Sequence, residues 1–186
     1  TVTGILTAQM DSVPLVILTG QTITPNLGKD AFQEADVFGV TMPIVKHSYL
    51  VRDVKDLSRV VNEAFHLAST GRPGPVLVDL PKDVVSNEWD EDFTKGLDLP
   101  GYQVQTSGST DGIENAAKLL SKSKQPLLYV GAGAVISGAG KQVQKLAEKL
   151  NAPVTTTLLG KGAFSEVHPL SVGMLGMHGT AYANKA

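Results

Sequence analysis

The turn Gly131-Ala132-Gly133 is the first candidate for chemistry, because it directly follows an apolar segment that ends at Val130. Glycines after a strand let the backbone approach a phosphate closely, and the free N–H groups of a following helix can bind an anion. The longer dinucleotide-binding pattern Gly-x-Gly-x-x-Gly fails here, since position 136 is Ile. The turn therefore indicates a nucleotide-like ligand, with a plain strand-to-helix turn as the alternative.

A second candidate lies after the apolar run at 13–19, where Thr19-Gly20-Gln21 is followed by the segment Gly-Lys-Asp-Ala-Phe-Gln-Glu at 28–34. Loops after the carboxyl ends of parallel strands are the usual ligand-binding places of α/β proteins. This favours a binding role for Phe32 and Gln33. The alternative is a polar surface loop anchored by its phenylalanine.

Two cations flank a third apolar segment, at 76–80. Arg72 stands between glycines and prolines, which hold it stiffly enough to clamp a phosphate or stack on a ring. Lys82 follows Pro81 at the carboxyl end of the predicted strand, where binding sites gather. A turn arginine and a solvated lysine are the alternatives.

The segment Met-Leu-Gly-Met-His-Gly-Thr at 174–180 is the fourth candidate. Its paired glycines next to Met177 and His178 suggest a backbone that comes close to a flat ligand. The alternative is a buried turn that enters a helix, with the histidine satisfied inside the core. The other three histidines are scattered without metal-ligand spacing, so we expect them to be structural or exposed and predict no metal site.

The elements that must position these residues follow from hydrophobic patterning. Short apolar runs predict strands at 13–19, 44–51, 76–80, 126–130 and 153–158, the first of them buried on both faces. The residues before 13 are also predicted to be helical. A spacing of three and four predicts helices after an N-cap at Asp53, after an N-cap at Asp111, and around 143–150. The apolar face of the helix after Asp53 is predicted to consist of Val54, Leu57, Val60, Val61, Ala64, Phe65 and Ala68. Strands alternating with helices predict an α/β fold with parallel, doubly wound sheets.

A change of pattern divides the chain in two. Residues 87–110 contain acids, glycine and proline without a sustained period, and are predicted to be a linker between the units 1–86 and 111–186. The chain begins without a methionine and both of its ends lie in helical patterns, so we expect an internal fragment of a longer protein.

Composition excludes several classes of protein. The chain is 42% hydrophobic and 18% charged with a formal net charge of −2, which is typical of a globular domain and gives no basic surface for nucleic acid. It contains no cysteine, so disulfides and cysteine-ligated metals are excluded. No apolar stretch reaches the roughly 20 residues of a membrane span. We expect neither nucleic-acid nor membrane partners, and favour the cytoplasm over an organelle.

Five motifs in order carry a resemblance to a known family: Met-Asp-Ser-Val-Pro at 10–14, Thr-Gly-Gln at 19–21, Asp-Ala-Phe-Gln-Glu at 30–34, Gly-Arg-Pro-Gly-Pro-Val at 71–76, and Leu-Gly-Met-His-Gly-Thr at 175–180. Together they closely resemble the catalytic large subunit of biosynthetic acetohydroxyacid synthase (acetolactate synthase). The resemblance implies that residues 1–86 are the C-terminal part of a thiamine diphosphate pyrimidine-binding domain. Residues 111–186 would be the N-terminal part of a Rossmann-like central domain that binds FAD.

The resemblance also implies an activity. It is the thiamine diphosphate-dependent decarboxylation of pyruvate and condensation with pyruvate or 2-ketobutyrate, in branched-chain amino-acid biosynthesis. Thiamine diphosphate, Mg²⁺ and FAD would be the cofactors, in a homodimer or higher oligomer with a separate regulatory subunit. The glutamate that activates thiamine and the Mg²⁺-binding domain would lie outside this chain, so the fragment alone is expected to be inactive.

Individual roles follow from the resemblance position by position. It places four residues at the substrate channel: Phe32, Gln33, Lys82 and Met177. It assigns the contacts with FAD to Arg72, Gly131, Ala132, Gly133, Thr157, Leu158, Leu175, Gly176, Met177 and His178. The chain departs from the family at Ala132, inside a three-glycine turn, and at Ile23, where many members carry a proline beside the inhibitor channel.

Two alternatives stay open. One is another thiamine enzyme of the same architecture, such as catabolic acetolactate synthase or pyruvate oxidase; the motif at 30–34 favours the biosynthetic enzyme instead. The other is a non-catalytic module that holds a nucleotide at the turn after Val130.

Overall fold

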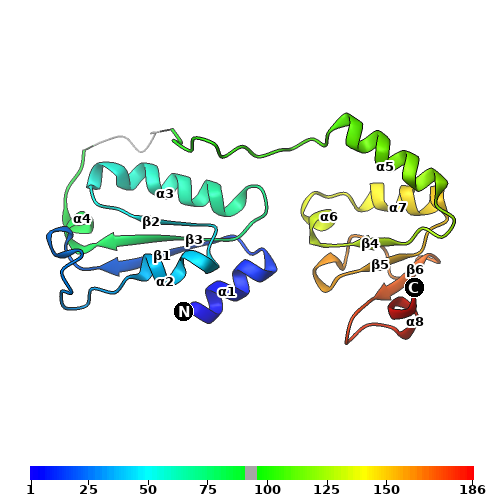
Figure 1. Ribbon diagram of the computed structural model, residues 1–186, viewed down its shortest axis with the longest axis horizontal. Coiled ribbons are helices and arrows are strands. Elements are labelled where there is room, and N and C mark those ends of the chain that lie inside the picture. Colours follow the sequence, from blue (N-terminus) through cyan, green and yellow to red (C-terminus); the bar gives the residue numbers. More distant parts are fainter. Residues whose placement is uncertain (91–95) are drawn as a thin grey trace. The chain divides into compact units, whose positions relative to one another are not determined.

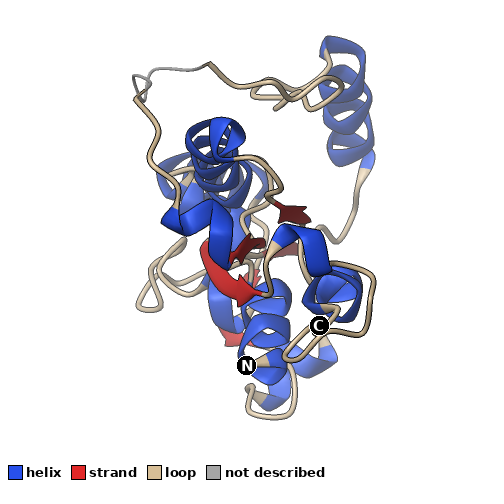
Figure 2. Cartoon of the chain, turned by 90° about the vertical axis from the view of Figure 1, so that its left-hand side faces the viewer, coloured by secondary structure: helices blue, strands red, loops and turns tan. Residues whose placement is uncertain are grey.

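The computed structural model describes residues 1–90 and 96–186, which form two compact units, Thr1–Thr106 and Ser107–Ala186. Each unit contains a three-stranded parallel sheet, which confirms the predicted α/β class (Figure 1, Figure 2). The elements of the first unit are α1 (Val2–Asp11), β1 (Leu15–Gln21), η1 (Thr24–Asn26), α2 (Val37–Thr41), η2 (Met42–Ile44), β2 (His47–Leu50), α3 (Val54–Ser69), β3 (Pro75–Pro81) and α4 (Lys82–Ser86). Those of the second are α5 (Thr110–Lys122), β4 (Leu128–Val130), α6 (Ala132–Ile136), α7 (Gly140–Leu150), β5 (Val154–Thr156), η3 (Leu158–Gly160), β6 (Ser171–Met174) and α8 (Ala181–Lys185).

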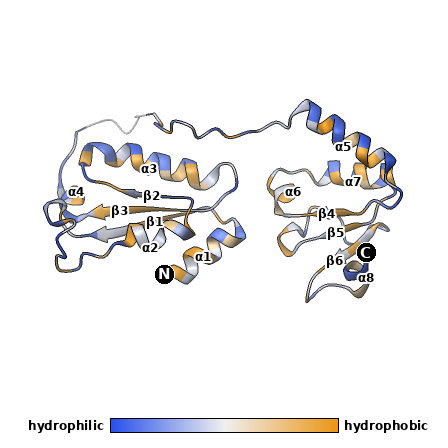
Figure 3. Ribbon diagram, in the orientation of Figure 1, coloured by the Kyte–Doolittle hydropathy of each residue, from blue (hydrophilic) through white to orange (hydrophobic). Residues whose placement is uncertain are grey.

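Strand β3 is the centre of the first unit, in the order β1-β3-β2. Because side chains alternate across a strand, Val76 and Val78 pack on the side of α3, while Leu77 packs with Ile5 and Val45 on the other. Figure 1 shows α3 on one side of the strands and α1 and α2 on the other, and in Figure 3 the hydrophobic colour runs along β3. Helices thus cover both faces of this sheet.

Helix α3 begins where the sequence predicts, because the Asp53 side chain accepts a hydrogen bond from the Lys55 N–H. Val60, Ala64 and Ala68 of the predicted apolar face are buried. Phe65 was expected on the same face but is 61% exposed, so that part of the prediction is wrong. Phe65 follows the fully buried Ala64, so its side chain is rotated by about 100° around the helix from the buried position.

The expected burial of the first strand on both faces is also wrong. Strand β1 lies at the edge of its sheet and pairs with β3 alone among the described residues. The Leu18 side chain is 60% exposed as a result. A continuous apolar run cannot distinguish a central strand from an edge strand, because it reports hydrophobicity and not neighbours.

The second unit packs α7 against the sheet β4-β5-β6, with Val130, Ala147, Val154 and Phe164 in its core. Helix α5 is capped by Ser109, whose hydroxyl accepts a hydrogen bond from the Gly112 N–H; the predicted cap at Asp111 is therefore wrong. Strand β6 was not predicted, since its sequence Ser-Val-Gly-Met carries a glycine and little apolar pattern. In the described part of the chain, no helix has the length and apolar character that crossing a membrane requires.

Part of the segment that we predicted to be a linker packs on the first unit. Residues 91–95 of that segment lie outside the described residues. Further on, Leu99 and Tyr102 pack against the α3 core, and the Tyr102 hydroxyl lies 2.9 Å from the Thr70 hydroxyl. The lack of a period therefore predicts irregular structure, but not the absence of contacts.

The buried carboxylate of Glu63 attaches this segment to α3. The Glu63 side chain is 1% exposed and accepts hydrogen bonds from Arg59 at 3.0 Å, from the Tyr49 hydroxyl at 3.0 Å and from the Asp98 N–H at 2.9 Å. Burial next to this carboxylate raises the pKa of Tyr49 above its ordinary value, so its hydroxyl stays a donor. One carboxylate thus joins α3, β2 and the segment after residue 97.

We predict that Glu63→Ala lowers the free energy of unfolding by about 3 kcal/mol, because it removes a fully buried acceptor and leaves three partly buried or exposed donors, from Arg59, Tyr49 and Asp98, without it. Asp56→Ala is the matched control, since Asp56 pairs with the same arginine at 2.9 Å but is half exposed. Its loss should cost less than about 1 kcal/mol. Urea unfolding measures both, and equal effects for the two variants would contradict the buried network.

Candidate functional site

A cavity of about 1050 Å³ opens at the carboxyl ends of β1 and β3. Three residues predicted at the substrate channel, Phe32, Gln33 and Lys82, line this cavity together. They meet because β1 and β3 are parallel neighbours, so the loops that follow both strands emerge at one edge. The other lining residues are Gly20, Gln21, Thr22, Ile23, Asn26, Ala35, Leu80, Val85 and Ser86.

The loop at 28–34 is shaped by the carboxylate of Glu34. It accepts hydrogen bonds from the N–H groups of Ala31 at 2.9 Å, of Lys29 at 3.2 Å and of Gly28. The Ala31 and Gly28 amides lower the pKa of Glu34 below its ordinary value. The loop presents Phe32 with 88% of its side chain exposed, next to Gln33 in the left-handed conformation at φ 60°.

Gln21 connects this loop to the sheet. Its Nε2 donates to the Ala35 carbonyl at 2.7 Å and to the Asp79 carboxyl at 3.0 Å. Asp79 is 1% exposed and also accepts from the Thr19 hydroxyl at 2.7 Å. Sequence reasoning did not single out Asp79, although one signal was present: it is the only polar residue in the strand Pro-Val-Leu-Val-Asp-Leu-Pro.

Lys82 begins α4, and its exposed side chain forms no hydrogen bond or ion pair with the described residues. The neighbouring Asp83 accepts from the Thr24 hydroxyl at 2.5 Å and from the Thr24 N–H at 3.0 Å. The Thr24 hydroxyl in particular lowers the pKa of Asp83. This tie fixes the loop that carries Ile23, another residue that lines the cavity.

Arg72 precedes β3, so it lies at the opposite edge of the sheet from this cavity. Its Nε donates to the Ser12 hydroxyl at 2.8 Å, and its terminal nitrogen donates to the carbonyls of Met10 at 3.2 Å and Gln9 at 3.3 Å. A cation at these last carbonyls of α1 complements the negative end of the helix. The guanidinium is exposed while it makes these bonds, which leaves part of it open to a ligand.

In the second unit, the predicted FAD-contacting residues follow the carboxyl ends of three adjacent strands. Gly131, Ala132 and Gly133 come after β4, Thr157 and Leu158 after β5, and residues 175–178 after β6. Since β4, β5 and β6 are parallel, these three loops emerge at one edge of the sheet. This is the edge at which open α/β sheets bind ligands.

The loop after β6 is held by its own polar contacts. The Asn184 side chain accepts from the Gly176 N–H at 2.7 Å and donates to the Gly176 carbonyl at 3.0 Å. The loop exposes 92% of the Met177 side chain, and His178 is exposed as well. The alternative of a core histidine is therefore wrong.

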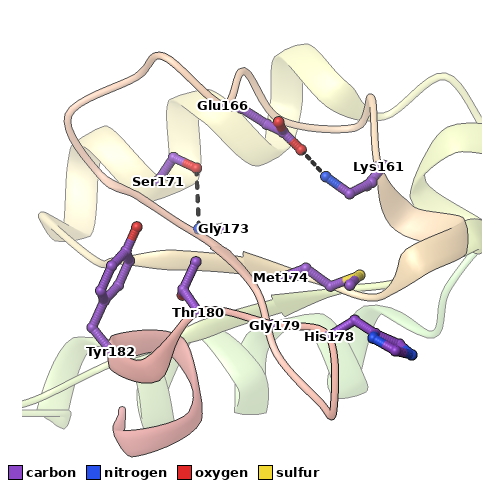
Figure 4. Close-up of a pocket in the computed structure, with 9 residues that line it drawn as sticks. All are labelled: Lys161, Glu166, Ser171, Gly173, Met174, His178, Gly179, Thr180 and Tyr182. Carbon is purple, nitrogen blue, oxygen red and sulfur yellow. Dashed lines mark hydrogen bonds and ion pairs between the residues drawn. The ribbon is translucent and has the colours of Figure 1, made fainter.

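A smaller cavity of about 320 Å³ lies next to this loop. Figure 4 shows His178 and Met174 at one end of it and Tyr182 at the other, with the ion pair of Lys161 and Glu166 above. Met177 belongs to the second unit, while the other three predicted channel residues belong to the first. No three His, Asp or Glu side chains within 1–90 and 96–186 are grouped closely enough to hold a metal ion.

Comparison with known proteins agrees with the resemblance. The family model for the central domain of thiamine pyrophosphate enzymes matches residues 113–186. Along its whole length the chain is 54% identical to an acetolactate synthase of Arthrospira platensis. It is 53% identical to the acetolactate synthase large subunit of Cyanidium caldarium, and 48% identical to a probable large subunit of Methanocaldococcus jannaschii. It covers 33%, 32% and 32% of these proteins. Along its whole length the chain is thus similar to acetolactate synthase large subunits, and it spans about a third of the length of these relatives.

Proposed function

We propose that this chain is one part of an enzyme that makes acetolactate. The enzyme decarboxylates pyruvate and joins the remaining two-carbon unit to pyruvate or 2-ketobutyrate, as a step of branched-chain amino-acid biosynthesis. The observation that carries the proposal is the identity of 46–54% along the whole chain with proteins named acetolactate synthase. The meeting of Phe32, Gln33 and Lys82 at one cavity supports it.

The chain's own contribution is to bind and orient the ketoacid. The Lys82 ammonium is free of protein partners within the described residues and can attract the carboxylate of pyruvate. Phe32 supplies an apolar surface on the same cavity, and Gln33 an amide that can donate and accept hydrogen bonds. Thiamine diphosphate, when bound, supplies the electron sink that decarboxylation requires. The resemblance also assigns Met177, in the second unit, to the substrate channel of the whole enzyme.

The loops after β4, β5 and β6 fit FAD in their chemistry. Added to Gly133, a Cβ would meet no atom within 4 Å, so the backbone there is open to a ligand. Leu158 and Met177 expose apolar side chains on neighbouring loops, which suits a flat ring system. With Arg72 as an anion or ring contact, these loops would hold FAD in a mainly structural role.

The domain assignment and the partners belong to the same proposal. Residues 1–86 would form part of the pyrimidine-binding domain and 111–186 part of the central FAD-binding domain, joined by 87–110. Mg²⁺ would be held by residues of the enzyme outside this chain. The enzyme would act in the cytoplasm as a homodimer or larger assembly, with a separate regulatory subunit.

The test is an acetolactate assay on a full-length protein that contains this chain, with thiamine diphosphate and Mg²⁺ supplied and FAD added or withheld. Activity that depends on FAD is the expected result. Activity indifferent to FAD would point to a thiamine enzyme of the catabolic type. Nucleotide binding without any acetolactate formation would point to a non-catalytic module.

We predict that Arg72→Ala in that protein weakens FAD binding about tenfold, the loss expected for one charge-assisted contact. Flavin fluorescence titration measures the affinity. Arg52→Ala is the matched control, because Arg52 is also exposed and forms no ion pair with the described residues. Ser12→Ala loosens the tie of Arg72 to α1 and should change FAD affinity less than about twofold. Unchanged affinity in Arg72→Ala would remove Arg72 from the FAD site.

We predict that Lys82→Ala lowers kcat/KM for pyruvate about tenfold or more, since a charge-assisted contact with the substrate is lost. The unfolding midpoint should change little, because the Lys82 side chain holds no other described residue. Lys29→Ala is the control: it removes the same charge from an exposed side chain that does not line the cavity. Equal kinetics in the two variants would show that Lys82 does not meet the substrate.

A further inference from the structure

We propose that Asp79 is a positioning residue for the cavity at β1 and β3: through the Gln21 amide, it sets the place of the loop that carries Phe32 and Gln33. Asp79 is 1% exposed and does not line the cavity, so it acts without touching a ligand. The inference rests on the proposed function of this cavity as the ketoacid site.

Both oxygens of Asp79 are used within the sheet. Oδ1 accepts from the Thr19 hydroxyl at 2.7 Å, and Oδ2 accepts from Gln21 Nε2 at 3.0 Å. The rest of β3 is apolar and buried, and a valine would suit such a position better than a carboxyl group. Burying a polar side chain here costs free energy, so a positioning role accounts for its presence where packing does not.

Asp79 fixes which way the Gln21 amide points. One N–H of the amide donates to Asp79 and the other to the Ala35 carbonyl at 2.7 Å, while Oε1 accepts from the Thr22 N–H at 2.8 Å. A flipped amide would turn its oxygen toward the Asp79 carboxyl and the Ala35 carbonyl, which are both acceptors. Asp79 therefore favours the orientation that holds Ala35, together with the Thr22 N–H, and it is the partner of this amide that lies on β3.

Ala35 directly follows the loop at 28–34, so the hydrogen bond from Gln21 to the Ala35 carbonyl ties that loop to β1. Glu34 closes the loop internally, but its bonds run only to amides of the same loop. Phe32, 88% exposed, adds almost no packing of its own. The bond from Gln21 to Ala35 is thus the side-chain tie, among the described residues, that joins this loop to the strand carrying the rest of the cavity wall.

The decisive variant is Asp79→Val, which fills the buried position and removes both acceptor oxygens at once. The Gln21 amide then loses its acceptor on β3, so its bond to the Ala35 carbonyl is held less firmly. Asparagine is unsuitable here, because it can turn its oxygen toward Gln21 and its NH₂ group toward the Thr19 hydroxyl, which accepts as well as donates. Thr19→Val is the matched control, because it removes the other hydrogen bond of Asp79 and leaves Gln21 in place.

The experiment uses the full-length protein with thiamine diphosphate, Mg²⁺ and FAD, and measures amide hydrogen exchange of peptides covering 28–35 together with kcat and KM for pyruvate. In Asp79→Val we expect exchange in this loop to accelerate about tenfold and kcat/KM to fall about tenfold, the effect of one lost hydrogen bond. In Thr19→Val both should stay within about twofold of the unchanged protein.

Gln21→Met is a second variant that breaks the same tie without touching Asp79, in case Asp79→Val does not fold. Because both residues act in one chain of hydrogen bonds, the double variant should be no worse than either single one. Loop exchange within twofold of the unchanged protein in folded Asp79→Val or Gln21→Met would overturn the inference, as would effects that multiply in the double variant. If the unchanged protein makes no acetolactate, the proposed function falls, while the exchange measurement still tests Asp79.

Discussion

The structure of the first unit depends on the parallel register of β1 and β3, which places Thr19 beside Asp79 and Gln21 beside Pro81. Helices cover both faces of β3, so its Val76, Leu77 and Val78 side chains are fully buried and fix the strand in place. A slip of one residue would turn each of these side chains to the other face. With the register fixed, the loops after β1 and β3 must emerge together, and the large cavity is a consequence of that meeting.

Around this cavity, carboxyl groups shape the backbone while other residues face the ligand. Glu34 gathers the amides of the loop at 28–34, Asp83 holds Thr24, and Asp79 orients Gln21. Phe32 and Lys82 remain exposed. A hydrogen bond to a fixed carboxyl group can hold a loop without a hydrophobic core beneath it, which leaves the exposed side chains free for a substrate. The pKa values of Glu34 and Asp83 are lowered. Their hydrogen bonds therefore contribute fully to stability at pH values above the ordinary pKa of a carboxyl group, and this contribution is lost as the pH falls through the lowered pKa values.

The sequence predicted the elements whose pattern is strong and local, such as α3 with its Asp53 cap and the buried run of β3. It also predicted that Phe32, Gln33 and Lys82 follow strand ends, which is why they could be expected near one another. What it could not predict depends on neighbours in space. Leu18 is exposed because β1 is an edge strand, and Asp79 matters because Gln21 and Thr19 lie on the adjacent strand. The contacts of Arg72 could not be predicted for the same reason, because its hydrogen bonds to α1 join positions about 60 residues apart in the sequence.

Apart from the glycines with positive φ, such as Gly138 and Gly176, two kinds of glycine occur in the second unit, and the distinction bears on the departure at Ala132. A Cβ on Gly160 would clash with the carbonyl oxygen of Val130, and one on Gly179 would clash with that of Met174, so these glycines let backbones pack against each other. At Gly133 a Cβ would meet open space, so packing within the described chain does not require that glycine. A requirement for glycine at Gly133 would then have to come from a ligand approaching the backbone. Ala132 stands at the first position of α6 in a helical conformation that any residue adopts, so the alanine is compatible with the turn.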